Sequence, residues 1–381
     1  MSLRLNGSTS GYSEIDAPAI AGNNTLVLPT TNGAANQLLK NGSTPGVLEY
    51  ASMTLDSAGN LGSVASINDG PLAGMRNRII NGNFAIGQRG TTFPSGFNNN
   101  DAYTLDRWYI LSDGNDAIDV TRETSVVPTN QKYAIALDVE TANKKFGIAQ
   151  IIESDNCVGL TGGTVTLSFK AKVSATTKLD NVKAAVVAWS GTADTVTSDI
   201  ISAWGAEDTN PTLIANATYE NTPANLSVTT SYATYSVTAN IDTASTTNII
   251  VFIWSDVTDT TAGDFLYVTD VQLEPGPVAT PFEQRPIGTE LALCQRYFET
   301  GNLNIRRGSS EAGEAQLEII RFCVTKRTSP TISAGGSLTN VNVASDSFIN
   351  IASNVFNWSV VPATVGGYQL SGRTFLASAE L

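Results

Sequence analysis

Alternation of apolar and polar residues runs through the middle of the chain and predicts β-strands there. Residues 165–173 alternate strictly, with apolar side chains on one face and Thr, Ser and Lys on the other. Similar patterns predict further strands at 133–139, 146–152, 235–241 and 265–273. Residues 249–254 (IIVFIW) are apolar throughout, which is typical of a central strand covered on both faces. These strands predict a two-sheet sandwich or jelly roll, decorated by the loop-rich span 190–226.

Patterning and composition together divide the chain into four predicted parts. They are an N-terminal anchoring arm at 1–75, a jelly-roll β-sandwich at 76–286, a linking helix at 287–300 and a smaller C-terminal β-sandwich at 301–381. The predicted fold class is therefore all-β. The arm has only brief apolar stretches between turn residues, so alone it buries too little apolar surface to offset its ordering entropy. We expect other chains to hold it, with a flexible linker as the alternative.

One helix is predicted, within residues 286–300. Gly288-Thr289 can begin it, and Glu290 suits its first turn. Apolar side chains at spacings of four, three and four then share one face; they are Ile287, Leu291, Cys294 and Phe298. A packing point on a threefold axis and a simple link between domains are both compatible with this pattern.

The stretch 76–108 opens the predicted sandwich. Residues 76–80 alternate and end in an apolar pair, Asn81-Gly82-Asn83 supplies turn residues that tolerate positive φ, and Phe84 and Ile86 resume the alternation. A strand, a turn and a second strand are therefore predicted here. Five aromatic residues follow within the stretch or just after it, which provides a large apolar contribution to the core.

Three motifs in this chain resemble a jelly-roll module of bacteriophage tail fibres and receptor-binding proteins. Residues 76–88 with Asp106-Arg107-Trp108 resemble its opening, and more distantly the first strand of carbohydrate-binding jelly rolls. Residues 271–283 (VQLEPGPVATPFE) resemble its last strand and exit, and residues 291–299 (LALCQRYFE) the segment that follows. Residues 2–28 also resemble a short N-terminal module of marine phage tail proteins of the cyanophage or podovirus type.

The resemblance implies a virion structural protein that binds without chemistry. It would be a tail fibre, assembled in the host cytoplasm as a homotrimer, anchored to tail adaptor or nozzle proteins through residues 1–75. Its distal parts would bind polysaccharide of the host surface, where repetition around a threefold axis raises weak affinities by roughly 10²–10⁴. A capsid decoration or head fibre protein and a glycan-degrading tail spike are the alternatives.

Charge and composition argue against several kinds of binding and catalysis. The net charge is −13 and the basic residues are unclustered, so neither nucleic-acid binding nor membrane insertion is expected. The chain has no histidine, which excludes Ser-His-Asp and Cys-His triads and His-ligated metals. Acidic residues crowd 256–274, but acids in such loops are usually turn formers, and no enzymatic activity is expected. The three cysteines, at 157, 294 and 323, are expected to be buried free thiols.

Two candidate sites remain. Glycans stack on aromatic rings beside amides and acids, and Trp189, Trp204 and Tyr219 flank or lie within the decorating loops, although core or subunit packing is the plainer interpretation. The resemblance to carbohydrate-binding jelly rolls implies one structural Ca²⁺ between Asn83 and Asp270. That family has an acid two residues after Asn83, where this chain has Ala85, so calcium is a possible cofactor and no other cofactor is expected.

Overall fold

The computed structural model describes residues 3–6, 9–15, 25–34, 37–44, 47–54, 74–242, 245–308 and 310–381. The chain divides into two compact units, Met1–Ile67 and Asn68–Leu381. Within these described ranges every element is a strand apart from two short helices, so the predicted all-β class is confirmed. Neither of the helices in these residues has the length and apolarity needed to cross a membrane.

The first unit contains two short antiparallel hairpins. β1 (Leu3–Asn6) pairs with β2 (Tyr12–Ile15), and β3 (Gln37–Asn41) pairs with β4 (Leu48–Thr54). A parallel bridge also joins Val27 to Val47. Each hairpin strand overlaps one of the brief apolar stretches of the predicted arm. Turn residues separate these stretches, which is a pattern typical of short strands.

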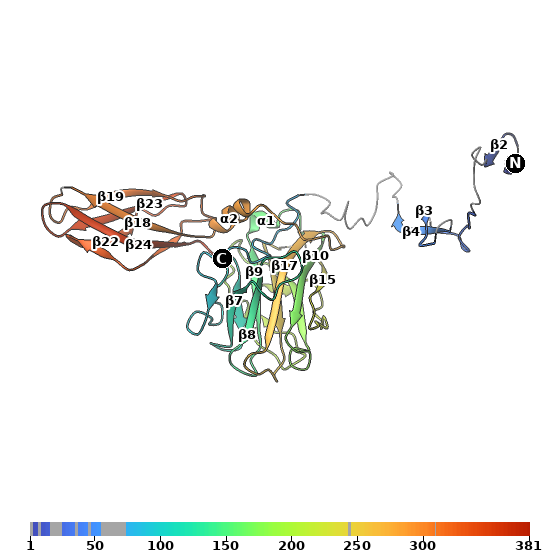
Figure 1. The fold of residues 1–381 in the computed structure, drawn as a ribbon, viewed down its shortest axis with the longest axis horizontal. Helices are drawn as coiled ribbons and strands as arrows, with labels where there is room; N and C mark the ends of the chain where they lie inside the picture. The colour runs from blue at the N-terminus through green and yellow to red at the C-terminus, as the bar shows by residue number, and fades with distance from the viewer. Residues whose placement is uncertain are drawn as a thin grey trace. The chain divides into compact units, whose positions relative to one another are not determined.

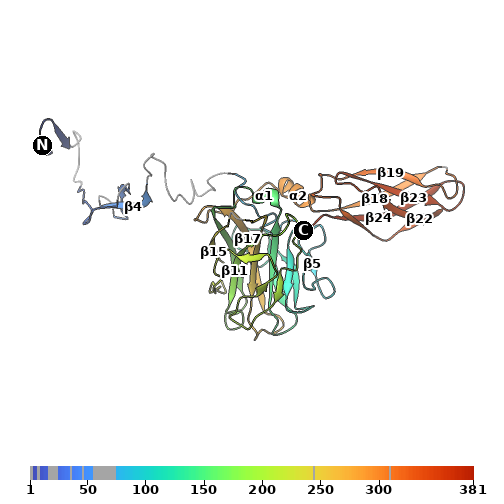
Figure 2. The same cartoon turned by 180° about the vertical axis from the view of Figure 1, so that it is seen from behind.

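Two antiparallel sheets form the sandwich that follows (Figures 1 and 2). The first sheet has the order β15-β10-β17-β8-β7-β5 and the second β14-β11-β16-β9-β6. The strands of the first sheet are β5 (Thr92–Phe93), β7 (Ile118–Glu123), β8 (Ala134–Val139), β10 (Thr164–Val173), β15 (Ala233–Asn240) and β17 (Phe265–Pro275). Those of the second are β6 (Tyr109–Ser112), β9 (Phe146–Ile152), β11 (Val182–Trp189), β14 (Ala217–Tyr219) and β16 (Asn248–Ser255). A single helical turn, α1 (Ser154–Cys157), follows β9.

The main core lies between these two sheets. The apolar face predicted for β10 points into it, from Val165 through Val173. In β16 the side chains alternate between two clusters: Ile249, Val251 and Ile253 join the main core. The residues between them, Ile250, Phe252 and Trp254, belong to a separate cluster on the outer face of the second sheet. The prediction that this strand is covered on both faces is therefore confirmed.

The span 190–226, called the insert below, covers that outer face. It contains the short strands β12 (Ile201–Ala203) and β13 (Thr212–Leu213), which pair with each other, and β14 at the edge of the second sheet. Apolar residues of the insert pack on the sheet and, together with its outer-face side chains, make up the second cluster; among them are Val196, Ile200, Ile201, Trp204, Leu213 and Tyr219. The loop predicted as decoration is thus a second hydrophobic layer.

The opening stretch 76–88 does not form the strand, turn and strand that its pattern predicts. It runs as irregular backbone with a turn at 81–83. Its apolar residues still divide between two places: Ile79 and Phe84 enter the main core, while Ile80 and Ile86 pack under the second helix. Side-chain hydrogen bonds, described below, take the place of a strand ladder.

The linking helix α2 (Ile287–Gln295) is shorter than predicted. Ile287 is 62% exposed, whereas Leu291 and Cys294 pack against Ile80 and Ile86. Phe298 is not on the helix, because it begins β18 (Phe298–Arg307) and pairs with Ser378. The predicted boundaries at 75, 286 and 300 remain predictions.

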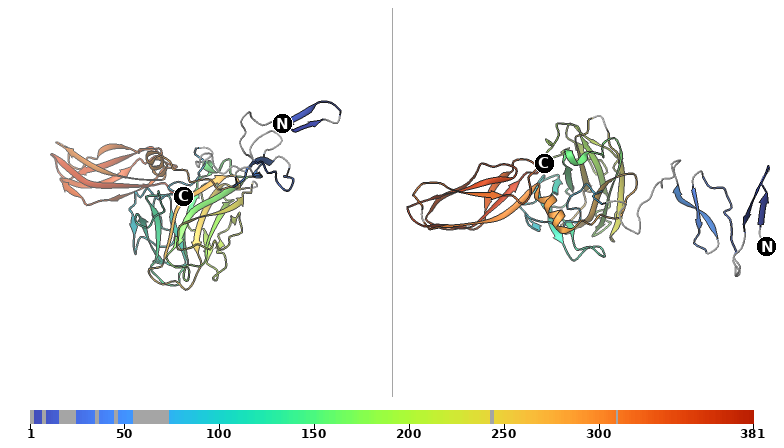
Figure 3. Two further views of the ribbon diagram at one scale, coloured as in Figure 1. Left: turned by 45° about the vertical axis from the view of Figure 1, so that its right-hand side comes forward. Right: turned by 90° about the horizontal axis from the view of Figure 1, so that it is seen from above.

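The C-terminal residues form a smaller β structure of two sheets, also visible in Figure 3. In one sheet β18 and β20 (Thr331–Gly335) flank β24 (Tyr368–Ser378), with which β21 (Thr339–Val341) also pairs. The other has the order β19 (Gln316–Arg321), β23 (Val355–Pro362), β22 (Val343–Ile349). Phe356, Trp358 and Phe375 lie in the core between them.

A buried ionic junction ties this structure to the sandwich. Arg107 is buried, bonds to the Glu380 carboxylate and the Ile151 carbonyl, and lies 3.7 Å from the ring centroid of Tyr297. Glu153 accepts bonds from Tyr297 Oη at 2.7 Å and Arg296 Nη2 at 2.6 Å. The last residues therefore lie beside the sandwich, as Figures 1 to 3 show.

The cysteines differ from the expectation at one position. Cys157 and Cys294 are buried free thiols, but Cys323 is exposed. Cys323 lies in the bend after β19, where its backbone N–H donates to the Glu299 carboxylate and its side chain is left facing water.

Candidate functional site

Asn81 and Gly82 hold the turn that leads into one wall of a pocket. The Asn81 amide donates to the carbonyls of Ile86 and Asp106 and accepts from the Ile86 N–H. Gly82 lies against β17, with its carbonyl accepting from the Val271 N–H at 2.9 Å. A Cβ at Gly82 would overlap the Val271 carbonyl, so only glycine allows this close approach.

Arg122, on β7, joins this turn to the start of β8. Its Nη1 donates to the Ala85 carbonyl at 2.9 Å, and its guanidinium lies 4.7 Å from the ring centroid of Tyr133. A cation over an aromatic face is attractive because the ring carries negative charge density there. Ala85 and Tyr133, distant in sequence, are therefore held by one side chain.

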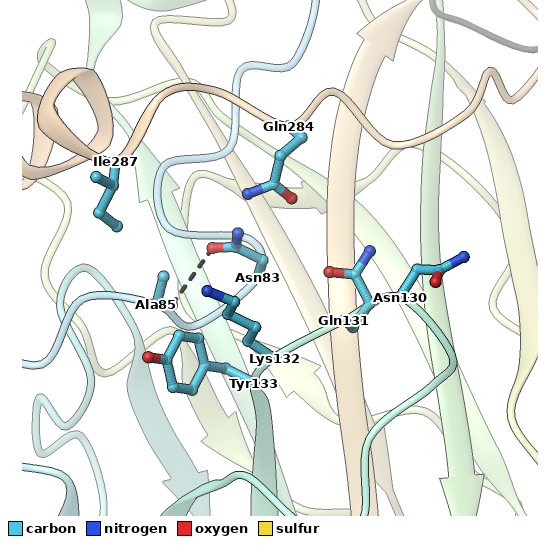
Figure 4. Close-up of a pocket in the computed structure, with 8 residues that line it drawn as sticks. All are labelled: Asn83, Ala85, Asn130, Gln131, Lys132, Tyr133, Gln284 and Ile287. Atoms are coloured by element: carbon cyan, nitrogen blue, oxygen red, sulfur yellow. Dashed lines mark hydrogen bonds between the residues drawn. The ribbon is translucent and has the colours of Figure 1, made fainter.

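Between these segments lies a pocket of about 500 Å³, shown in Figure 4 and called the amide pocket below. Its lining residues are Asn83, Ala85, Asn130, Gln131, Lys132, Tyr133, Gln284 and Ile287. Four are amides, one is an ammonium and one a phenol, and none carries a carboxylate. Amides supply both donors and acceptors, so the pocket suits a ligand with many hydroxyl groups.

Most polar groups of the amide pocket are not engaged by the protein. Among the described residues, the side chains of Asn130, Lys132 and Gln284 make no hydrogen bond. Asn83 accepts the Ala85 N–H at 3.3 Å through Oδ1, which leaves its two amide hydrogens available. Gln131 uses one amide hydrogen on Asp270 and keeps its oxygen.

Asp270 lies behind the pocket and anchors it. It is a left-handed residue of β17, with φ 54°, and its side chain is buried. Its Oδ2 accepts from Gln131 Nε2 at 3.0 Å and from Lys170 Nζ at 2.9 Å, while Oδ1 has no hydrogen-bond partner. Burial raises the pKa of Asp270 above its ordinary 3.8, although the bond from Lys170 opposes the rise.

The two expected calcium ligands lie in and behind the same pocket. Asn83 lines the pocket, and Asp270 is joined to it through Gln131. A Lys170 ammonium already neutralises Asp270, and Ala85 contributes no carboxylate. Ca²⁺ takes six to eight oxygen ligands, and no group of three or more acids, cysteines or histidines in the described residues could hold a metal. These residues do not by themselves fit the ion, and calcium stays a prediction.

The three expected aromatic glycan contacts lie together elsewhere, in the second cluster. Trp189 is 9% exposed, and Trp204 and Tyr219 are partly buried against the same sheet. Tyr219 stacks on Trp254 at 6.4 Å, and Trp204 meets Phe252 edge-on at 6.1 Å. Their rings pack between the insert and the outer face of the second sheet, and glycan binding through them stays a prediction.

Each of the acids crowded in 256–274 pairs with another side chain or accepts a hydrogen bond. Asp256 pairs with Lys183 at 2.8 Å, and Asp264 accepts from Thr261. Glu274 accepts from Thr280 and Arg76. Asp259 pairs at 3.6 Å with Lys178, and both are solvent-exposed. With Asp270 paired to Lys170, the cluster is a set of turn and sheet contacts, as acids in such loops often are.

Sequence reasoning missed most of the amide pocket. Four of its residues, 130–133, are a consecutive run directly before β8, and two, Gln284 and Ile287, lie between β17 and α2 or at the start of α2. The available signal was the run Asn-Gln-Lys-Tyr, which places an amide pair, a cation and a ring at the entrance of a strand.

Comparison with known proteins identifies no family. No protein-family model matches the chain. No curated protein matches it either.

Several solved structures align with about half of the chain. The enzymatically active domain of tailspike protein 4 from bacteriophage CBA120 aligns at 16% identity and TM-score 0.30, over 53% of this chain and 22% of that one. A family 16 carbohydrate-binding module aligns at 14% identity and TM-score 0.25, over 41% and 84%. The xylan-binding CBM22-1 domain of Xyn10C from Paenibacillus barcinonensis aligns at 12% identity and TM-score 0.28, over 49% and 94%. Similarity at this level leaves the function to be argued from the residues themselves.

Proposed function

We propose that this chain is a structural protein of a phage virion that binds glycans of the host surface in the amide pocket. The pocket carries the proposal: it offers several unengaged amide groups, a phenol and an ammonium around about 500 Å³. Sugars present many hydroxyl groups and an apolar ring face. Amides can bond the hydroxyls, and Tyr133 and Ile287 offer apolar surface beside them.

The role in a fibre is supported by the sequence motifs and by the first unit. Residues 76–88, 271–283 and 291–299 resemble one phage fibre module in the same order. In the first unit, Leu26 and Leu28 are 65% and 66% exposed, more than a stable isolated segment would leave in water. Contact with identical chains in a homotrimer, and with tail adaptor proteins, would cover them.

The proposed mechanism is binding without bond cleavage. The acids crowded in 256–274, the candidates for glycoside hydrolysis, are engaged with lysine, arginine or threonine partners, several of them on other segments of the sandwich. A single weak site repeated around a threefold axis gives firm attachment, because linked sites raise the effective concentration by roughly 10²–10⁴.

The glycan proposal is tested with the full-length protein on immobilised surface polysaccharide from the host. Gln284→Ala removes one exposed, unengaged amide from the pocket, and we expect about threefold to tenfold weaker binding. Asn99→Ala removes an exposed amide outside the pocket and serves as the control. Binding that survives Gln284→Ala but is lost in Trp204→Phe, at unchanged melting temperature, would move the site to the second cluster.

The assembly proposal is tested separately. Sedimentation of the purified chain should give a trimer, and images of the intact particle should place its first unit on the tail. A monomer at micromolar concentration, with a first unit that resists protease, would contradict the assembly. Density on the capsid would instead favour the head fibre alternative.

A further inference from the structure

The amide pocket differs in charge from the rest of the molecule. The chain has 35 acidic and 22 basic residues and a net charge of −13. None of the pocket's lining residues is acidic, and one, Lys132, is a cation. The acid behind the pocket, Asp270, is already paired with Lys170 at 2.9 Å. The pocket is therefore a locally positive site on an acidic protein.

Lys132 also differs from every other lysine in the residues that the structure describes. Five lysines pair with a carboxylate: Lys40, Lys170, Lys178, Lys183 and Lys326. Lys144 and Lys145 donate to backbone carbonyls, and Lys172 lies near the rings of Tyr232 and Tyr267. Lys132 alone has no carboxylate, carbonyl or ring partner there. Its ammonium is exposed at the pocket and available to a ligand.

Neutral donors surround this ammonium. The Asn83 oxygen accepts the Ala85 N–H, which leaves both amide hydrogens of Asn83 free. The Gln284 side chain makes no hydrogen bond among the described residues. Figure 4 shows the side chains of Lys132, Asn83 and Gln284 directed into the same space. An ammonium with amide N–H groups beside it is suited to an anionic oxygen group, because charge-assisted bonds are the stronger kind.

We propose that the amide pocket binds a sugar residue that carries an anionic oxygen group, a carboxylate or a sulfate, with Lys132 pairing to that group. The inference rests on the proposed glycan-binding function and adds the class of sugar. The amides would hold the sugar hydroxyls, and Lys132 would select acidic polysaccharides over neutral ones of the same backbone.

The test compares three oligosaccharide probes of equal length with the full-length protein by calorimetry. They are oligogalacturonate, the same oligomer with its carboxyl groups reduced to alcohols, and a sulfated galactose oligomer. We expect about tenfold tighter binding of a charged oligomer than of the reduced one. Preference for the carboxylate or the sulfate probe identifies the anionic group.

Two lysine variants make the test specific. Lys132→Gln should weaken binding of the charged probe about tenfold and remove most of the difference between the charged and reduced probes, while Lys132→Arg should retain most of that difference. Lys144→Gln is the matched control, because Lys144 follows the far end of β8 whereas Lys132 precedes its start. Both positions lie outside strands, and equal melting temperatures confirm folding.

Two outcomes would overturn the inference. They differ in whether the glycan-binding proposal still holds. If reduced and charged oligomers bind equally, and Gln284→Ala weakens both, the pocket binds glycans but does not select charge. If neither these probes nor host polysaccharide binds, both this inference and the glycan-binding proposal fail.

Discussion

The outer faces of two sheets, one in the sandwich and one in the C-terminal structure, are covered very differently. Every residue of β16 is buried, and Ile250 on its outer side is fully enclosed. In β19, half-buried and exposed residues alternate, and Ile319 on its outer side is 67% exposed. Both strands carry isoleucine on the outer side, so composition does not explain the difference.

The difference comes from the insert. Residues 190–226 lie over the outer face of the second sheet and provide it with a second hydrophobic layer. A sheet with two apolar faces needs such a layer, because exposed apolar area is unfavourable by about 25 cal/mol per Å². The C-terminal structure leaves Leu317 and Ile319 in water. Apolar residues on a strand are therefore evidence of burial only where another segment covers them.

The largest predicted effect comes from truncating the same residue type on the two outer faces. Ile250→Ala should lower the free energy of unfolding by about 3 kcal/mol, because it leaves a cavity between sheet and insert. Ile319→Ala should change it by no more than about 0.5 kcal/mol. Chemical denaturation of both variants measures the contrast, and equal losses would show that the face of β19 is covered in solution.

A smaller effect is predicted at the junction that joins the two regions. Burial alone would raise the pKa of Glu153, but hydrogen bonds from Arg296 and Tyr297 outweigh it and hold the pKa below its ordinary 4.5. A carboxylate of lowered pKa stabilises the fold above its unfolded pKa, and this contribution is lost as pH falls below 4.5. Glu153→Gln should therefore cost about 1–2 kcal/mol at pH 7 and make acid unfolding less steep.

Glu140→Gln is the control for that experiment. Glu140 is exposed, and its side chain makes no hydrogen bond in the described part of the chain. Carboxylates titrate in roughly the range from pH 3 to 7. Melting temperatures measured over this range should depend on pH differently in the two variants. A Glu153→Gln protein that matches the wild type at neutral pH would show that the junction does not stabilise the fold.

The smallest predicted difference concerns thiol reactivity. Burial raises the pKa of the Cys157 thiol to about 12 and that of Cys294 above its ordinary value, so neither should react in the folded protein. Cys323 is exposed, but the Glu299 carboxylate beside its thiol raises its pKa too, so its alkylation should accelerate above pH 9. Mass spectrometry should find one label on the native protein and three after unfolding. Early labelling of Cys157 would indicate that the sandwich opens locally.

Regular strands could be predicted well, because the period of two is a local property. The apolar run at 249–254 and the alternation at 165–173 appear as β16 and β10 with the expected faces. Prediction failed where contacts from elsewhere decide the backbone. Residues 76–88 have a strand pattern but are held as irregular chain by Asn81 and the close approach of Gly82 to β17. Likewise, Phe298 is predicted on the helix but pairs with β24 instead.

The sequence by itself determined the all-β class and the absence of histidine chemistry, since both follow from residue types and their spacing. Only the tertiary structure decided the amide pocket. It is assembled from residues 83–85, 130–133 and 284–287, which meet because β17 pairs with β8 in one register and Gly82 lies against β17. No local pattern specifies which distant segments meet, because that depends on the order of strands in the sheet.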